Sequence, residues 1–201
     1  RELGINALYL NPIFDSASNH KYNARDFDNV DPSFGGNDAL AELREALDEA
    51  DMYYILDLTP NQTGDDHNWF ESAQANPDTD VSDFYTFHNH PDDYESRLGV
   101  KTLPDLNYTS QRLRDRMYRK TDAIMQKWLR SPFRADGWRL DVWNMTARQA
   151  QTDVQREVGR EIRDAVKGVR SDAYLFGEHF FDASTTLQGD EMDAVMNYQG
   201  F

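Results

Sequence analysis

The sequence contains no cysteine, which excludes disulfide bonds and cysteine-ligated metal sites. It also contains no apolar run close to the roughly 20 residues that a membrane-spanning helix requires, so we expect no membrane partner. A glycine-rich phosphate loop, of either the G-x-G-x-x-G or the Walker type, is missing as well. This last absence argues against a nucleotide-dependent α/β enzyme.

Positive charge is scarce in this chain. It carries 21 Lys and Arg residues against 36 Asp and Glu residues, which gives a formal net charge of −15. Such a surface repels the phosphates of nucleic acids and the headgroups of anionic membranes, and we expect neither as a partner. Because salt screens this self-repulsion, we put forward a halophilic origin as a hypothesis.

The chain does contain an alternation of strand-like and helix-like segments. Short apolar runs predict strands at residues 4–10, 52–58, 136–141, 174–178 and 193–198. Apolar residues at helical spacing predict helices at residues 39–47, 111–130 and 148–168, the first of them capped by Asn37 or Asp38. The alternation predicts a globular α/β fold with parallel strands that are covered on both faces.

Polar side chains follow the strands at the points where they end, namely Asn11, Asp57, Asp141 and Glu178. Functional sites of (β/α)8 barrels are built on this rim, so we predict part of such a TIM barrel. A doubly wound open sheet is the alternative, although it usually carries a glycine fingerprint. Only five strands can be counted, whereas a closed barrel of this type needs eight. We therefore expect the chain to be a fragment of a longer protein.

Two segments show no periodicity. Residues 13–37 form a loop that is long for a connector, which suggests that it carries function. Residues 65–107 are polar and predict a small irregular subdomain inserted after the second strand. We therefore divide the chain into barrel parts at residues 1–64 and 108–201, with the inserted subdomain at residues 65–107 between them.

The stretch Ala135–Asp141 carries the most specific chemistry. Arg139 and Asp141 are two residues apart, so on a strand they point to the same face. A buried Arg beside an Asp is costly unless the two pair, and pairing keeps the Asp ionised. An ionised, oriented carboxylate can attack a sugar carbon, and a purely structural ion pair is the alternative interpretation.

Glu178 supplies a second carboxylate one βα unit further along the chain. Neighbouring barrel strands place their end groups side by side, and two carboxylates about 5–5.5 Å apart are typical of a retaining glycosidase. We expect the aromatic neighbours Phe176, Phe180 and Phe181 to raise the pKa of Glu178, so that it serves as the acid.

Five motifs in order resemble those of the α-amylase family of glycoside hydrolases, and together they span essentially the whole chain. They are residues 4–12, 57–61, 103–107, 137–141 and 177–178. Residues 20–23, 30–36, 177–180 and 196–201 are similar to the branch that holds maltodextrin glucosidases, cyclomaltodextrinases and neopullulanases, with maltodextrin glucosidases the most alike. The resemblance implies barrel strands two to six.

The resemblance also implies roles for individual residues. Asp141 would be the nucleophile, Glu178 the general acid/base and Arg139 the partner that orients Asp141. Tyr22 would stack on the sugar, and Asp57 would hold the polar network of the site. Further substrate-binding candidates are Gln62, His20, Trp143 and His179, of which Trp143 is favoured as a second sugar-stacking ring.

The sequence departs from the family in two places. Gln62 stands where the family usually has a His that binds the primary hydroxyl of the sugar, and Gln can donate one such bond but cannot take up charge. The third carboxylate of the family, which follows an Asn-His pair, has no counterpart in these residues. We therefore expect the isolated chain to be inactive.

The implied activity is cleavage of α-1,4-glucosidic bonds in maltodextrins by double displacement, in the cytoplasm and without a cofactor. Calcium bound by Asn61 and Asp105 is possible but not favoured, and His67, His88 and His90 are expected to be solvated loop residues rather than zinc ligands. The resemblance also allows a homodimer of the full-length protein. Transglycosylation, a cyclomaltodextrinase or neopullulanase activity and a non-catalytic binding barrel are the alternatives.

Overall fold

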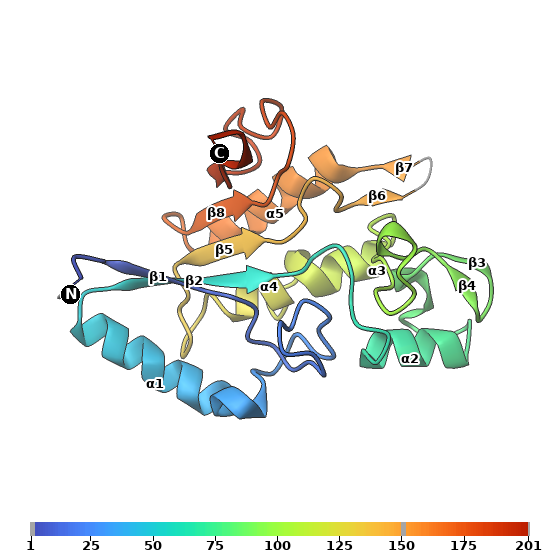
Figure 1. Cartoon of the computed structure of the whole chain (residues 1–201), viewed down its shortest axis with the longest axis horizontal. Coiled ribbons are helices and arrows are strands. Elements are labelled where there is room, and N and C mark those ends of the chain that lie inside the picture. The colour runs from blue at the N-terminus through green and yellow to red at the C-terminus, as the bar shows by residue number, and fades with distance from the viewer. Residues whose placement is uncertain (1–2, 150–151, 201) are drawn as a thin grey trace.

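The computed structural model describes residues 3–149 and 152–200. Phe201, the last residue of the final motif, and residues 150–151 of the predicted third helix lie outside the described residues. Figure 1 shows a parallel sheet crossing the molecule, with the segment after its second strand extending to the right as a separate lobe.

Within the described residues, five parallel strands form the main sheet. They are β1 (Ala7–Leu10), β2 (Tyr53–Leu58), β5 (Gly137–Leu140), β8 (Tyr174–Gly177) and β9 (Ala194–Val195). Their order in the sheet, β1-β2-β5-β8-β9, is their order in the chain. A doubly wound sheet reverses its order at a switch point, whereas a (β/α)8 barrel does not. The sheet is therefore an arc of a TIM barrel.

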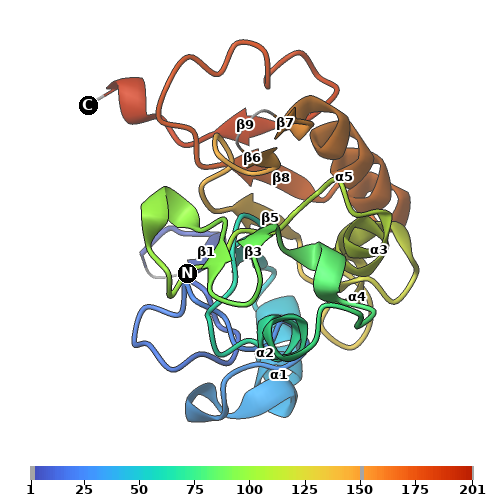
Figure 2. The same cartoon turned by 90° about the vertical axis from the view of Figure 1, so that its right-hand side faces the viewer.

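The helices that connect these strands cover the outer side of the arc. α1 (Gly36–Glu49) connects β1 to β2, and α5 (Gln155–Val169) connects β5 to β8. In Figure 2, α4 (Ile124–Lys127) and α5 lie to the right of the sheet and α1 lies below it. Large aromatic side chains fill the layer between sheet and helices, and the indole N–H of Trp138 donates to the Met125 carbonyl oxygen at 3.0 Å.

The strands differ in burial: β5 is buried on both faces, as predicted, whereas β2 and β8 each expose a tyrosine on the inner face. On β2, Tyr54, Leu56 and Leu58 have no exposed surface, whereas Tyr53 on the opposite face is 54% exposed. Tyr174 on β8 is 45% exposed. Successive side chains of a strand point to opposite faces, so the strands bury an apolar outer face and leave tyrosines accessible on the inner face.

The predicted helix at residues 111–130 is broken in the structure. It consists of α3 (Gln111–Arg114), a π-helical turn (Asp115–Arg119) and α4 (Ile124–Lys127), with extended backbone at Lys120. The buried side chain of Gln126 explains how the break is tolerated. Its amide nitrogen donates to the carbonyl oxygens of Tyr118 and Arg119, at 2.7 and 3.3 Å, and so replaces helical partners.

The third predicted helix starts later than expected. Residues 148–149 (β6, Arg148–Gln149) and 152–153 (β7, Thr152–Asp153) pair as antiparallel strands before α5 begins. The predicted cap of α1 is also wrong. Its cap is Gly35, and the side-chain oxygen of Asn37 instead accepts the Val30 N–H at 2.9 Å, which anchors the long loop.

The segment after β2 is irregular, as the sequence predicts. It holds α2 (Asn68–Ala75), the hairpin of β3 (Phe87–Asn89) and β4 (Asp93–Tyr94), and short 3-10 turns at Ser82–Phe84 and Arg97–Gly99. An antiparallel bridge between Gln62 and Asp105 ties its end to the residues after β2. The boundaries given for this subdomain stay a prediction.

Candidate active site

Four charged side chains meet at the carboxyl-terminal ends of β2, β5 and β8. The parallel register sets Asp57 beside Arg139 and Arg139 beside Phe176, so that Asp57 and Arg139 lie on adjacent strands. Asp141 and Glu178 follow the last residues of β5 and β8 directly. The strand ends therefore bring three carboxyl groups around one guanidinium group.

Arg139 holds this cluster together. Its Nη1 donates to both carboxylate oxygens of Asp57, at 3.1 and 2.9 Å, and to Asp141 Oδ1 at 2.6 Å. Its Nη2 lies 2.9 Å from Glu178 Oε2. Asp141 and Glu178 thus bind the two terminal nitrogens of one guanidinium group, which brings their carboxyl groups close together. Since all four side chains are buried, the charges can be accommodated only as a mutually paired group.

The electrostatic environment differs between the carboxyl groups. Burial raises the pKa of Asp57 to about 6 and that of Asp141 to about 7, against the opposing attraction of Arg139. Burial would raise the pKa of Glu178 too. Three groups outweigh this effect of burial and hold the pKa of Glu178 below its usual value. They are the Val142 N–H, the Tyr198 hydroxyl and the Arg139 guanidinium.

This order of pKa values is opposite to the one expected from the sequence. Two of the three phenyl rings that were expected to desolvate Glu178 are themselves exposed, Phe180 to 37% and Phe181 to 68%. Glu178 instead accepts hydrogen bonds from the Val142 N–H at 2.9 Å and from the Tyr198 hydroxyl at 2.8 Å. Hydrogen bonds to the charged form favour ionisation, which explains the reversal.

Val142 is held in a strained conformation to make its contact. Its φ is 48°, in the left-handed region that a β-branched residue rarely adopts. In this conformation its N–H donates to Glu178 Oε2. Strained backbone of this kind is characteristic of functional sites, where the surrounding structure compensates for it.

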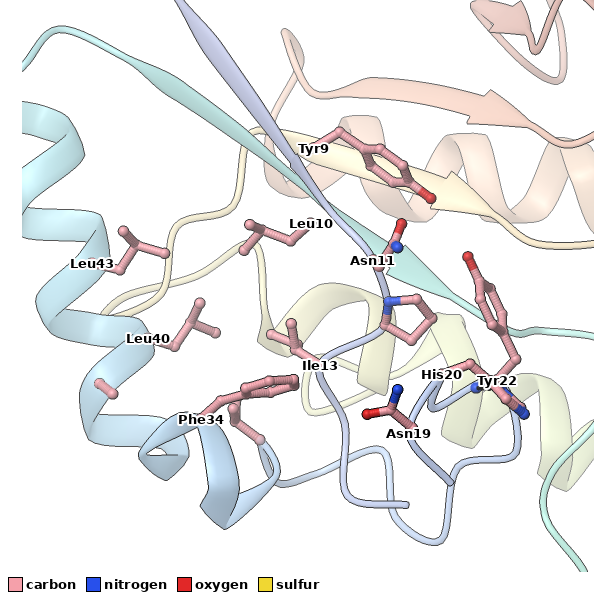
Figure 3. Close-up of a pocket in the computed structure, with 13 residues that line it drawn as sticks. Tyr9, Leu10, Asn11, Ile13, Asn19, His20, Tyr22, Phe34, Leu40 and Leu43 are labelled. Atoms are coloured by element: carbon pink, nitrogen blue, oxygen red, sulfur yellow. Dashed lines mark hydrogen bonds between the residues drawn. The ribbon is translucent and has the colours of Figure 1, made fainter. Parts of the chain in front are cut away.

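Tyr22 and His20 lie beside the cluster on the long loop after β1. The Tyr22 hydroxyl donates to Asp57 Oδ2 at 3.1 Å, and the His20 and Tyr22 rings stack with centroids 6.0 Å apart. Both residues line a cavity of about 610 Å³ between β1, this loop and α1. Figure 3 shows its polar end at Tyr9, Tyr22 and His20, and its apolar end at Leu40 and Leu43.

Gln62, Trp143 and His179 lie close to the cluster but do not offer the expected surfaces. Gln62 has no exposed surface, and its amide nitrogen donates to the Tyr22 carbonyl oxygen at 3.2 Å, so it supports the loop rather than facing a sugar. The prediction that Trp143 stacks on substrate is wrong, because its ring is completely buried and packs where a Cβ on Gly177 would fall. The buried His179 ring accepts the Phe181 N–H at 3.3 Å.

The candidate metal ligands are engaged in other contacts. Asn61 turns its amide nitrogen to Asp105 Oδ1 at 2.7 Å, and burial together with Glu95 raises the pKa of Asp105 to about 7. His67 is not a solvated loop residue, since it is buried and caps α2 by accepting the Trp69 N–H at 3.1 Å. Across residues 3–149 and 152–200, no group of three or more His, Asp or Glu side chains is arranged to hold a metal ion.

Sequence reasoning missed two tyrosines of this site. Tyr9 on β1 donates its hydroxyl to Asp57 Oδ2. Tyr198, in the 3-10 turn Tyr198–Gly200, donates to Glu178 Oε1. The position of Tyr9 could have indicated its role, because it lies on the inner face near the end of its strand. Tyr198 belonged to a motif that was recognised, but no rule of spacing connects it to Glu178.

Comparison with known proteins agrees with the fold and the motifs. The cyclomaltodextrinase of Geobacillus thermopakistaniensis is 33% identical over 98% of this chain and 32% of its own length, and the intracellular maltogenic amylase of Bacillus subtilis is 31% identical over 98% and 32%. The chain thus spans about a third of these relatives. A crystal structure of a debranching enzyme from Nostoc punctiforme superimposes with a TM-score of 0.85 at 32% identity, over 98% of this chain and 40% of that one.

In the part of the chain that the structure describes, no helix combines the length and apolarity needed to cross a membrane.

The sequence profile of the alpha-amylase catalytic domain matches residues 1–201. The chain therefore belongs to the α-amylase family, of whose catalytic domain it forms part of the barrel.

Proposed function

We propose that the full-length protein is a retaining glycoside hydrolase that cleaves α-1,4-glucosidic bonds of maltodextrins. One observation carries this proposal: a single guanidinium group, that of Arg139, holds Asp141 and Glu178 together at the ends of adjacent strands. Two carboxyl groups at such close range are what double displacement at a sugar carbon requires.

In the proposed mechanism, Asp141 attacks the anomeric carbon while the bond from that carbon to the leaving oxygen breaks. Glu178 gives its proton to the leaving oxygen in the same step. Water then attacks the glycosyl-enzyme, Glu178 takes up a proton from it, and the bond to Asp141 breaks. The reactive form of the pair is the one with its proton on Glu178, because Asp141 must attack as a carboxylate and Glu178 must supply a proton.

Asp57 and Tyr22 fit the role of binding the sugar next to Asp141. Asp57 is fixed by Arg139, and Tyr22 reaches Asp57 from a loop that also lines the adjacent cavity. We propose that the Tyr22 ring and the exposed His20 contact the substrate from this side, and that His179 contributes on the side of Glu178. Gln62 would act indirectly, through the Tyr22 backbone.

The substrate class is supported by the names of the relatives. Two of them are called cyclomaltodextrinase and intracellular maltogenic amylase, and both match nearly all of this chain. The second name also supports a cytoplasmic location, which we include in the proposal. Transfer to a sugar acceptor instead of water would use the same two carboxyl groups and is the second candidate activity.

The test is replacement of Asp141 in the full-length protein. We expect Asp141→Asn to lower kcat for maltotriose hydrolysis about a thousand-fold or more, because the amide cannot form the glycosyl-enzyme. Asp78→Asn, at an exposed position of the inserted segment, is the matched control and should leave kcat unchanged. NMR of the first product should show retention of the α-anomer. Substantial turnover by Asp141→Asn, or an inverted first product, would refute the mechanism.

A further inference from the structure

We propose that Tyr198 is a positioning residue that holds Oε1 of Glu178, the oxygen that carries the acid proton, and strengthens Glu178 as an acid. The inference deepens the proposed function and rests on it. Its basis is a single contact between two side chains that lie twenty residues apart in the sequence. The Tyr198 hydroxyl, in the turn after β9, donates to Glu178 Oε1 at 2.8 Å.

The other oxygen of Glu178 is occupied by groups that can only donate. Oε2 accepts the Val142 N–H at 2.9 Å and lies 2.9 Å from Arg139 Nη2. A backbone amide and a guanidinium group have no lone pair to accept a hydrogen bond. A proton on Oε2 would therefore face two other protons. These two donors disfavour a proton on Oε2, so we place the proton of neutral Glu178 on Oε1, the oxygen that Tyr198 contacts.

A hydroxyl group is suited to this place because it can both donate and accept. While Glu178 is neutral, the Tyr198 oxygen can accept from Oε1 or turn its hydrogen away. When the proton moves to the leaving oxygen, the O–H bond at Oε1 breaks and the new alcohol O–H bond forms. Tyr198 keeps its own proton and donates it to the carboxylate that remains. The hydrogen bond thus stabilises the conjugate base of the acid.

The surroundings hold Tyr198 in this position. Its ring meets the Phe180 ring edge-on, with centroids 5.2 Å apart. The charged and titratable groups that act on Glu178 are Arg139 and Asp141 from the β5 side and Tyr198 from the turn after β9. The direction of the pKa changes agrees with the contact, since the Glu178 bond raises the pKa of Tyr198 and the Tyr198 bond helps to lower that of Glu178.

The experiment is Tyr198→Phe in the full-length protein, which removes the hydroxyl and keeps the ring contact with Phe180. Loss of a donor to a charged group should raise the alkaline-limb pKa of the kcat/KM profile by about half a unit to one unit. It should lower kcat about tenfold for maltotriose, whose leaving group needs the acid. For a 2,4-dinitrophenyl α-glucoside, which needs little protonation, kcat should change by less than about twofold.

Tyr94→Phe is the matched control, because it deletes a hydroxyl that donates to the Lys101 carbonyl oxygen in the inserted segment. An unshifted alkaline limb, or an equal loss with both substrates, would overturn the proposal. If Tyr198→Phe does not fold, 3,5-difluorotyrosine at position 198, a stronger donor, should move the alkaline limb down, and a limb that stays or rises would overturn it. Absence of α-glucoside turnover in the wild type would instead refute the proposed function.

Discussion

Three buried carboxyl groups share one guanidinium group in this site, and their protonation has consequences for stability as well as for chemistry. Asp57, Asp141 and Glu178 together can carry three negative charges, whereas Arg139 supplies a single positive charge. The excess negative charge is unfavourable in a buried place, and burial accordingly raises the pKa of Asp57 and of Asp141. A chain selected for stability alone would not be expected to keep this arrangement.

We therefore expect Asp141→Asn to stabilise the full-length protein at pH 8. The pKa of Asp141 is about 7 in the folded state, against about 3.9 for an unperturbed Asp. Between these two values the folded state binds the extra proton, so stability falls as pH rises from about 4 to 7. The amide has no such proton, so the loss should be absent in the variant.

Thermal unfolding at pH 5 and pH 8 measures this effect. The difference in Tm between the variant and the wild type should be larger at pH 8, and Asp78→Asn should show no such dependence. An equal Tm difference at the two pH values would contradict the pKa assigned to Asp141. The hydrogen bond from Arg139 Nη1 to residue 141 does not need the negative charge of Asp141, because the amide oxygen of the Asp141→Asn variant can still accept it.

The residues of the site divide by whether a rule for strands connects them. The same-face rule for alternate residues on a strand predicted the contact of Arg139 with Asp141, and the strand-end rule brought in Asp57 and Glu178. The pKa order was predicted wrongly because the decisive donors, the Val142 N–H and the Tyr198 hydroxyl, are not apparent from the sequence near Glu178. Backbone strain at Val142 and the path of the chain after β9 become known only from the folded structure.

Among the elements, the strands were predicted better than the helices. An apolar run predicts a strand wherever one face is buried, and all five runs became parallel strands of one sheet. The predicted helix at residues 111–130 has an apolar stripe throughout, because Leu113, Met117 and Trp128 are all buried. The stripe does not show that the backbone leaves the helix at Lys120. That break depends on one polar side chain, Gln126, which periodicity treats as a surface residue.

Replacing this side chain should destabilise the full-length protein. Gln126→Leu keeps a similar volume but leaves the Tyr118 carbonyl oxygen buried without its donor at 2.7 Å. A buried polar group that loses its partner costs about 1–3 kcal/mol, and the free energy of unfolding in urea should fall by that amount. Gln111→Leu, at an exposed position of α3, is the matched control. A variant as stable as the control would show that the break does not need Gln126.

On the scale of the whole molecule, the formal charge of −15 sets how stability responds to salt. Many carboxylates are paired, as Asp193 is with Arg163 and Lys167, and salt weakens such exposed pairs only slightly because each contributes little. The unpaired excess repels itself over longer distances. The screening length shrinks from about 10 Å at 0.1 M salt to about 3 Å at 1 M, so added salt relieves this repulsion.

We expect the Tm of the full-length protein to rise by several degrees between 0.05 and 1 M KCl. Glu42, Glu45 and Glu49 are exposed acidic residues of α1, and changing all three to Gln takes the net charge of this chain from −15 to −12. Because the variant carries less repulsion, it should be more stable than the wild type at 0.05 M KCl and gain less from added salt. A Tm that stays level or falls with KCl in the wild type would refute the role given to charge repulsion and remove the basis for a halophilic origin.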